Sequence, residues 1–419
     1  MNLKRRIKKL FNKAEKKGSL TGRIYTALIK TKRNLRYAKY SKLPVEKNLI
    51  IFESFMGRKY TDSPKAIYEY MLNSSEYTEY NFVWAFRDSV IEDFKQLENN
   101  ERTHLVRWGS DEYYRTYATA GYWIVNTRIP QSIKRKQGQE YIQCWHGTPF
   151  KKLGCDIVGE TTESADTRKK VIYEDVKRYT YLLSPSSYFT EIMTSALALN
   201  SLKKKPVIVE KGYPRNDSIT NRDEKKANRI RKELRIPEGK KVILYAPTYR
   251  EDKRGEAYEY RYKESLDLLR LREAIGDKYI VMHRSHYYIK AQDQTGDIGN
   301  FVIDVSDYPE INDLYIVADI LVTDYSSVFF DFGILKRPVI FYMYDLDYYK
   351  DSLRGLYLDL DDLPGPIAKT QKELEELLLT LETWSRENIW KKRYQDFSDR
   401  FTYNEDGKTT EKVVNVIFK

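Results

Sequence analysis

Cysteine, histidine and long apolar runs are all scarce in this 419-residue sequence. Its two cysteines, Cys144 and Cys155, are too few for a disulfide framework. They lack the clustered Cys and His spacing of a zinc site, so the sequence predicts neither a metal nor a cofactor. No apolar stretch approaches the ~20 residues of a membrane span, and no apolar region of a secretory signal follows the basic start. A reducing cytoplasm fits this composition.

Glycine-rich phosphate-binding loops are also missing. The chain contains no G-x-x-x-x-G-K-[ST] loop and no G-x-G-x-x-G at a strand-to-helix turn. Any phosphate recognition would therefore depend on a helix N-terminus and arginines. The absence of a G-x-S-x-G elbow argues against a hydrolase of that type.

Positive charge is concentrated at the N-terminus. The formal net charge is +12, yet residues 1–42 alone contain 15 lysines and arginines against Glu15, which leaves −2 for the remainder. Apolar residues recur on one face of a predicted helix, at Leu3, Ile7, Leu10 and Phe11. A second segment after Gly18 repeats the pattern with Ile24, Leu28 and Ile29.

This arm, residues 1–48, has three interpretations. A basic amphipathic helix can lie on an anionic membrane surface, to which each Lys or Arg contributes about 1 kcal/mol. A basic arm can also bind nucleic-acid phosphates, or it can be a solvated helix docked on the body. The apolar stripe favours the membrane.

From Leu49 onward, short apolar runs alternate with helical patterns, which predicts mostly parallel sheets in an α/β fold. The first half has predicted strands at Leu49–Glu53, Phe82–Phe86, Leu105–Trp108, Tyr122–Val125, Tyr141–Cys144, Tyr181–Ser184 and Val207–Glu210. The second has them at Val242–Tyr245, Tyr279–His283, Phe301–Asp304, Ile320–Thr323 and Val339–Tyr342. The charged helical stretch Asn221–Arg235 follows an inter-domain crossing, which predicts domains at residues 49–220 and 221–419.

The stretch Tyr141–Gly154 holds the leading catalytic candidate. A short strand runs into a Trp-His-Gly-Thr-Pro turn. Gly147 and Pro149 in this turn break the strand just after its carboxyl end. The turn places His146 on a loop beside two lysines, where an anionic substrate can sit. A histidine in such a turn is a candidate for proton transfer, and the alternative is that it only helps to close the turn.

Further candidates follow strands of the second half, because ligands of open parallel sheets bind outside the carboxyl ends of strands. They are Thr248 and Arg250, Arg284 and His286, and Asp324, Ser326 and Ser327, with Asp331 one turn further on. Serines opening a helix supply hydroxyls and backbone N–H groups for a phosphate. Arginines can hold phosphate oxygens bidentately, and a carboxylate can accept hydrogen bonds from ligand hydroxyls.

Each of these residue types also has an ordinary structural role. Ser326 and Ser327 are equally suited to N-capping, and Asp331 is favoured near any helix N-terminus. Asp324 either orients a histidine or caps the helix. Surface arginines are usually just solvated.

Six motifs in one order resemble a known family. They are WHGTPFKKLG (Trp145–Gly154), SPSSYFTEIM (Ser184–Met193), KGYPRND (Lys211–Asp217), YAPTYRE (Tyr245–Glu251), RSHY (Arg284–Tyr287) and ADILVTDYSSVFFDFGILKRPVIFYMYDLDYY (Ala318–Tyr349). Together they resemble the CDP-glycerol glycerophosphotransferase family of teichoic acid synthesis, over roughly Leu49 to Tyr349. The ordered set is far more specific than any single motif.

The resemblance implies two Rossmann-like domains facing across a cleft, of the GT-B type, in a peripheral enzyme at the cytoplasmic face of the cell membrane. It implies transfer of glycerol phosphate or ribitol phosphate from a CDP-alditol to an undecaprenyl-diphosphate-linked acceptor, with release of CMP. The donor would bind mainly to the C-terminal domain and the acceptor near the N-terminal domain.

The resemblance also suggests a role for each candidate. His146 would be the general base on the acceptor hydroxyl, and His286 would stabilise or protonate donor phosphate oxygens. The pyrophosphate would be held by Arg284, Ser326 and Ser327, and a donor hydroxyl by Asp331. Second-rank candidates are Thr248, Arg250, Lys211 and Arg215, with Asp324 as an orienting group. His283 could compete with His286, although its place inside a strand favours core burial.

Two other classes of function share parts of this pattern. A GT-B nucleotide-sugar glycosyltransferase or epimerase would have the same architecture. A nucleic-acid-binding protein is disfavoured, because the basic charge is confined to the arm and no binding module is recognised. The short region before Leu49 leaves open whether one unit or many are added, and no residue separates glycerol from ribitol.

Overall fold

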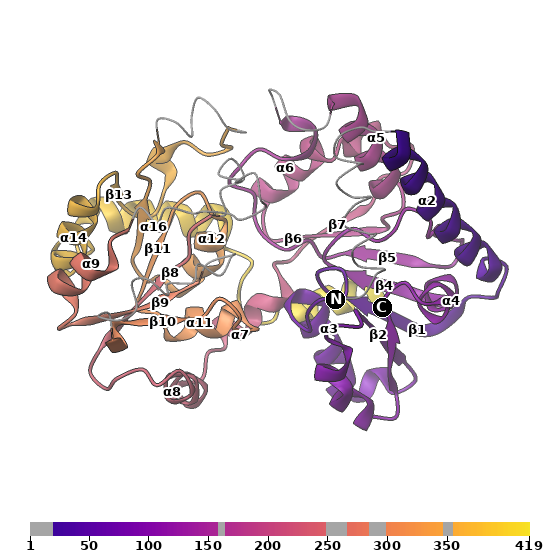
Figure 1. Cartoon of the computed structure of the whole chain (residues 1–419), viewed down its shortest axis with the longest axis horizontal. Coiled ribbons are helices and arrows are strands. Elements are labelled where there is room, and N and C mark those ends of the chain that lie inside the picture. The colour runs from indigo at the N-terminus through magenta and orange to yellow at the C-terminus, as the bar shows by residue number, and fades with distance from the viewer. Residues whose placement is uncertain (1–19, 158–163, 249–265, 285–298, 347–354) are drawn as a thin grey trace. The chain divides into compact units, whose positions relative to one another are not determined.

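The computed structural model describes residues 20–157, 164–248, 266–284, 299–346 and 355–419 (Figure 1). Contacts between Cα atoms divide the chain into two compact units. Unit 1 comprises residues 1–60, 71–143 and 178–181. Unit 2 comprises residues 61–70, 144–177 and 182–419.

The first sheet has seven strands in the order β3-β2-β1-β4-β5-β6-β7. They are β1 (Glu46–Glu53), β2 (Asn81–Phe86), β3 (Thr103–Arg107), β4 (Ala120–Val125), β5 (Glu140–Gln143), β6 (Tyr181–Ser184) and β7 (Val207–Glu210). β1 pairs in parallel with both β2 and β4, so the strand order reverses direction beside β1. Residues 50–52 in β1 are fully buried and apolar, as expected for a parallel strand covered on both faces.

Helices precede and connect these strands. They are α2 (Leu20–Tyr40), α3 (Asp62–Asn73), η1 (Ser75–Tyr77), η2 (Ile91–Asn99), α4 (Asp111–Thr119), η3 (Gly154–Asp156), α5 (Ala165–Val176), α6 (Ser187–Ala196) and η4 (Leu199–Ser201). Sequence signals set their starts: Ser110 and Ser186 cap α4 and α6 with side-chain oxygens that accept backbone N–H groups.

The second sheet has six strands in the order β10-β9-β8-β11-β12-β13. They are β8 (Lys241–Tyr245), β9 (Tyr279–His283), β10 (Val302–Asp304), β11 (Ile320–Thr323), β12 (Val339–Tyr342) and β13 (Ile367–Ala368). Neighbouring strands of this sheet pair in parallel, and the order reverses between β8 and β11.

Alternate residues of these strands enter two separate cores, because successive side chains of a strand point to opposite faces. Val242 and Leu244 join the core that contains Phe329 and Phe397. Ile243 joins the other core, with the apolar faces of α9 (Leu268–Ile275) and α14 (Gln371–Leu379). Figure 1 shows α9 and α14 together beside this sheet.

The remaining helices all belong to unit 2. They are η5 (Pro214–Asn216), α7 (Asp217–Thr220), α8 (Glu224–Glu233), η7 (Gly299–Phe301), α11 (Ile311–Val317), α12 (Val328–Phe332), η8 (Gly333–Leu335), η9 (Leu360–Asp362), α15 (Leu381–Trp384), α16 (Asn388–Phe401) and α17 (Thr409–Phe418).

The prediction of two α/β domains with parallel sheets is confirmed. Every predicted strand is present to within three residues at either end. The helix α5 was not predicted, and neither was β13, whose two residues are too few for a periodic signal. The predicted domain boundaries at residues 49 and 221 remain predictions.

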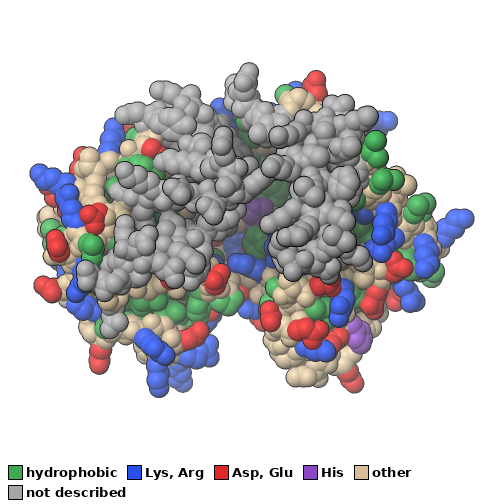
Figure 2. Space-filling model, in the orientation of Figure 1, with side chains coloured by type: hydrophobic (Ala, Val, Ile, Leu, Met, Phe, Trp, Pro, Cys, Tyr) green, Lys and Arg blue, Asp and Glu red, His purple; other side chains and the backbone are tan. Residues whose placement is uncertain are grey.

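The second half of the basic segment is the helix α2, and the first half lies outside the described residues. α2 leaves Ile24, Leu28 and Leu35 exposed. Figure 2 shows apolar and basic side chains interleaved along the edge of the molecule where Figure 1 places α2. Within the described part of the chain, no helix is both long and apolar enough to cross a membrane.

Candidate functional site

The Trp-His-Gly-Thr-Pro turn directly follows β5 and the buried Cys144. Trp145 adopts a positive φ of 55°, a conformation that non-glycine residues rarely adopt and that is often found at functional sites. Its ring stacks on that of His146, with centroids 5.2 Å apart and planes 18° apart. The backbone conformation and the stacking orient His146, whose side chain is exposed.

The segment that follows the turn is held by contacts within unit 2. The hydroxyl of Tyr188 donates to the Pro149 carbonyl at 2.9 Å, and the Phe150 ring packs edge-on against Phe329. The backbone N–H of Tyr357 donates to the Phe150 carbonyl at 2.9 Å. The turn is therefore fixed to the core beneath α12.

The turn meets the carboxyl end of β11 at Gly147. A Cβ atom at this glycine would lie 3.1 Å from Oγ of Ser327, a tighter contact than nearly all real Cβ atoms make. Glycine therefore allows the backbone beside His146 to approach Ser327. Two motifs that are about 180 residues apart in the sequence thus lie together in unit 2.

Ser327 is the first residue before α12, but its hydroxyl makes no capping hydrogen bond. Ser326 and Ser327 are both half-buried. Asp324 is buried, and its Oδ1 accepts the backbone N–H of Thr248 at 2.8 Å. This bond links the ends of β8 and β11, so Asp324 positions the segment that carries Thr248.

A buried ionic network lies one turn beyond the serines. Arg215 donates from Nη1 to Asp62 at 3.2 Å and from Nη2 to Asp331 at 2.9 Å, and all three side chains are buried. Burial alone would lower the pKa of Arg215, but the Asp331 and Asp62 carboxylates outweigh burial and raise it. Arg215 is therefore held as a cation between two carboxylates.

The network continues into the loop before α17. Nδ2 of Asn216 donates to Asp331 at 3.1 Å and to Glu405 at 3.2 Å, and the backbone N–H of Tyr213 donates to Glu405 at 3.0 Å. Burial raises the pKa of Glu405 to about 8. Asp217 then accepts the first backbone N–H groups of α17, so the C-terminal segment is fastened to the KGYPRND motif.

The other predicted site residues are less closely grouped. Nη1 of Arg284 donates to the carbonyls of Val305 and Tyr308, both at 2.9 Å, and burial lowers the pKa of this guanidinium. Lys211 is exposed. His283 is half-buried and stacks on Tyr245 rather than lying fully in the core. Arg250 and His286 lie outside the described residues.

Three residues of the network were missed by the sequence analysis: Asp62, Asn216 and Glu405. Asn216 lies within a motif that was singled out, so its place beside Arg215 was the available signal. Asp62 has a positive φ of 69° at the start of α3, and nothing in the local pattern marks it. Glu405 is separated from Asn216 by 189 residues, which no local pattern spans.

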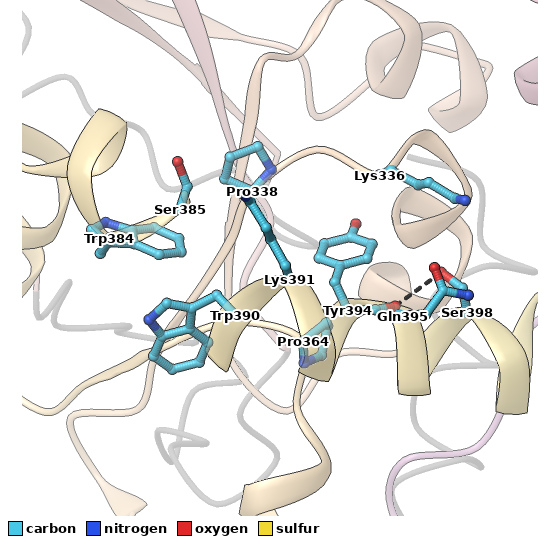
Figure 3. A pocket seen from close by; sticks show the side chains of 10 residues that line it. All are labelled: Lys336, Pro338, Pro364, Trp384, Ser385, Trp390, Lys391, Tyr394, Gln395 and Ser398. Carbon is cyan, nitrogen blue, oxygen red and sulfur yellow. Dashed lines mark hydrogen bonds between the residues drawn. The ribbon is translucent and has the colours of Figure 1, made fainter. Parts of the chain in front are cut away.

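Neither a metal-ligand cluster among the described residues nor the pocket of Figure 3 adds to this site. Among the described residues, no group of three or more His, Cys, Asp or Glu side chains is arranged to hold a metal ion. Figure 3 shows a pocket of about 220 Å³ beside α16, lined by Trp384, Trp390, Lys336 and Lys391 among others. None of its lining residues is a predicted site residue.

A family model described as CDP-Glycerol:Poly(glycerophosphate) glycerophosphotransferase matches residues 35–419. The chain belongs to this family. The match includes all six motifs and both sheets, so the resemblance inferred from the sequence is confirmed.

Curated relatives in this family have closely related sequences. A teichoic acid glycerol-phosphate transferase of Staphylococcus aureus is 40% identical over 90% of this chain and 95% of its own length. A teichoic acid poly(glycerol phosphate) polymerase of Bacillus subtilis is 37% identical over 100% of this chain, but over only 54% of its own length. The chain therefore spans about half of the latter relative and nearly all of the former.

The fold is similar to a solved member of the family. The structure of the wall teichoic acid polymerase TagF matches with a TM-score of 0.81 and 36% sequence identity, over 95% of this chain and 96% of that chain. The similarity therefore extends through both parallel sheets.

Proposed function

We propose that this protein transfers glycerol phosphate from CDP-glycerol to a lipid-linked teichoic acid precursor and releases CMP. The observation that carries the proposal is the approach of the His146 turn to Ser327 in a member of the glycerophosphotransferase family. In this proposal, His146 is the general base, and the helix N-terminus after Ser327 holds the phosphate that reacts. Glycerol is proposed over ribitol because both curated relatives above are named for glycerol phosphate.

On the donor side, the pyrophosphate of the CDP-alditol is placed at the carboxyl end of β11. The hydroxyls of Ser326 and Ser327, of which that of Ser327 makes no capping hydrogen bond, and the first N–H groups of α12 supply donors for its oxygens. Arg284 and His286 complete the charge neutralisation on this side. Thr248, whose backbone N–H donates to Asp324, lies at the same edge of the sheet, and Arg250 is proposed as a further donor-binding residue.

On the acceptor side, His146 removes the proton from the attacking hydroxyl. That oxygen forms a bond to the β-phosphorus while the bond to the leaving CMP breaks, so the alditol phosphate passes to the acceptor. Such a step requires alignment and charge stabilisation more than covalent chemistry. The exposure of His146 and its stacking on Trp145 leave the imidazole accessible and oriented.

Asp331 and Arg215 have a double role in this proposal. Both carboxylate oxygens of Asp331 already accept hydrogen bonds, from Arg215 and Asn216. A carboxylate offers about four lone-pair sites, so about two remain, and one of them can accept from a donor hydroxyl. Arg215 fixes the position of that carboxylate, and Lys211 contributes positive charge from the exposed edge of the same motif.

We also propose a GT-B arrangement with the two domains facing across a cleft, and a peripheral location on the cytoplasmic side of the cell membrane. The arm at residues 1–48 would lie on anionic lipid near an undecaprenyl-diphosphate-linked acceptor. Support comes from the 15 basic residues among residues 1–42 and from the exposed apolar side chains of α2.

The test is acceptor-dependent release of CMP from CDP-glycerol and from CDP-ribitol, with a lipid-linked acceptor analogue. His146→Ala is expected to lose roughly 10²–10⁴-fold in turnover, the usual contribution of a general base. His104→Ala is the matched control, because His104 is also exposed but lies on β3 in unit 1. Release of UDP from a UDP-sugar, with no CMP from either donor, would overturn the proposal.

A further inference from the structure

Unit 1 contains a cluster of arginines around one tryptophan that the reaction described above does not use. Arg58 follows β1 by five residues, Arg87 directly follows β2, and Trp108 directly follows β3. Arg33 reaches the same ring from α2. Because β1, β2 and β3 are adjacent and parallel, their carboxyl ends lie at one edge of the sheet, where open α/β sheets bind ligands.

The cluster is built around the face of Trp108. The guanidinium carbons of Arg87 and Arg33 lie 4.9 Å and 5.8 Å from the ring centroid. The indole N–H donates to the buried carboxyl of Glu53 at 3.2 Å, which fixes the orientation of the ring. Tyr113 and Tyr117 donate to the other oxygen of Glu53, both at 3.0 Å, so the base of the cluster is rigid.

Arg87 is also held in place by the backbone. Its Nε donates to the Met56 carbonyl at 2.8 Å, and its own N–H donates to the Gly57 carbonyl at 2.7 Å. The two terminal nitrogens of Arg87 make no hydrogen bond within the described part of the chain. They remain available as the paired donors that suit phosphate oxygens.

The positive charge of this cluster is not neutralised by paired acids. In the same unit, Arg107 pairs with Asp88, Arg36 pairs with Asp111, and Arg102 donates to two carbonyls. Arg33, Arg58 and Arg87 have no such ion pair among the described residues.

The pKa shifts of Arg87 and Glu53 also favour an anion at this cluster. Burial and the repulsion from Arg58 both lower the pKa of Arg87, so the two arginines lie close enough to destabilise each other. Burial also raises the pKa of Glu53 to about 7, so this acid is only partly charged at neutral pH. An anion bound at the cluster would relieve the repulsion.

We propose that Arg33, Arg58 and Arg87 with Trp108 form an anion site that binds a phosphate group of the acceptor. The proposal rests on the proposed function, since it assigns an acceptor subsite to the same reaction. The phosphate is a diphosphate or phosphodiester carried by the acceptor, rather than a membrane headgroup.

The geometry of α2 distinguishes the acceptor phosphate from a membrane headgroup. At about 100° per residue, Leu28 and Leu35 lie within about 40° of Ile24, and Arg33 lies about 180° from Ile24. The exposed apolar stripe of α2 therefore faces away from the arginine that joins the cluster. Lipid contact through that stripe leaves Arg33 on the body side of the helix.

The test is direct binding of a water-soluble glycerol phosphate oligomer, measured by calorimetry without any CDP-alditol. Arg58→Gln and Arg87→Gln are each expected to weaken binding about tenfold, since each removes one charge-assisted contact. Arg115→Gln on α4 is the matched control, because Arg115 is exposed and lies outside the cluster. Arg58 is also exposed, so its replacement does not endanger the fold.

A second experiment distinguishes binding to lipid headgroups from binding to the acceptor phosphate. Binding to phosphatidylglycerol vesicles is expected to be the same for wild type, Arg58→Gln and Arg87→Gln. Loss of vesicle binding with unchanged oligomer binding would assign the arginines to headgroups and overturn the proposal. A wild-type protein that fails to bind the oligomer, or variants that bind it like the wild type, would also overturn it.

These outcomes are distinct from failure of the proposed function. A wild type that releases CMP normally while the variants bind the oligomer unchanged would remove only the subsite. A wild type that binds the oligomer through the arginines but releases no CMP would remove only the transferase activity.

Discussion

Arg215 and Asp331 are joined by a buried 2.9 Å ion pair between segments that are 116 residues apart. The pair connects the KGYPRND motif to the helix that follows β11. Because Asp62 completes the network on the other side of Arg215, one guanidinium compensates two buried carboxylates. The position of α12, and of the serines that precede it, therefore depends on an arginine from a distant motif.

Replacing this arginine is expected to destabilise unit 2 strongly. Arg215→Gln leaves Asp62 and Asp331 buried without a cation, which typically costs about 3–5 kcal/mol in the free energy of unfolding. Arg222→Gln, the same change at an exposed position, should shift it by no more than about 0.5 kcal/mol. Urea unfolding of the two variants makes the comparison, and equal midpoints would contradict the assigned role of the network.

Glu405 is expected to make the stability of the protein depend on pH. Burial raises its pKa from 4.5 to about 8, so the folded state keeps a proton that the unfolded state releases between these values. The free energy of unfolding should therefore fall as pH rises through this window. Glu405→Gln keeps the group neutral, so its stability relative to wild type should increase from pH 5 to pH 9.

Thermal unfolding across this pH range tests the prediction. Glu411→Gln provides the control, because Glu411 is exposed on α17 and its replacement should not alter the pH profile. If the two variants show parallel profiles, Glu405 does not hold a proton in the folded state.

Two glycines beside Trp108 should respond differently to alanine. Both have positive φ, 71° for Gly57 and 75° for Gly109, so each substitution should cost about 1–2 kcal/mol of backbone strain. A Cβ at Gly57 would also lie 3.0 Å from the Ala85 carbonyl oxygen and 3.2 Å from the Trp108 ring, whereas nothing lies within 4 Å at Gly109. Gly57→Ala should therefore be the more destabilising and should alter tryptophan fluorescence. Identical effects would show that the loop relaxes without moving the ring.

Alanine substitutions of two serines at helix starts should have different effects on donor binding and on stability. Ser327 makes no capping bond, so Ser327→Ala should leave stability nearly unchanged while raising the KM for CDP-glycerol. Ser186 caps α6 through its side chain, so Ser186→Ala should cost about 1 kcal/mol without a specific effect on the donor. Steady-state kinetics gives the KM of both variants, and thermal unfolding gives their stability. A stability loss at Ser327 with unchanged KM would assign it a structural role.

The sheet architecture was predictable because parallel strands are short, nearly continuous apolar runs. Such runs can be recognised in the amino-acid sequence alone. Residues 320–323 and 339–342 were located to the residue for this reason. The meeting of the His146 turn with Ser327 was not visible in the same way, since it depends on how distant loops pack.

The network around Asp331 shows where sequence patterns lose information. A carboxylate one turn into a helix has the same local pattern whether it faces a ligand or an arginine. Its partner Arg215 comes from a segment 116 residues away in the chain. Asp62 is connected to it only through Arg215, and Glu405 only through Asn216. The ordered motifs indicated the family, but only the structure shows which of their charged residues pair with one another.

The attachment of the C-terminal segment to the KGYPRND motif has a consequence for biosynthesis. Asn216 and Asp217 are made early, whereas Glu405 and the Thr409 and Thr410 N–H groups that complete their hydrogen bonds are made about 190 residues later. In the nascent chain, the polar groups of this motif are therefore hydrated until these partners have been made. The hydrogen bonds between the KGYPRND motif and residues 405–410 therefore form only after every strand of the second sheet has been made.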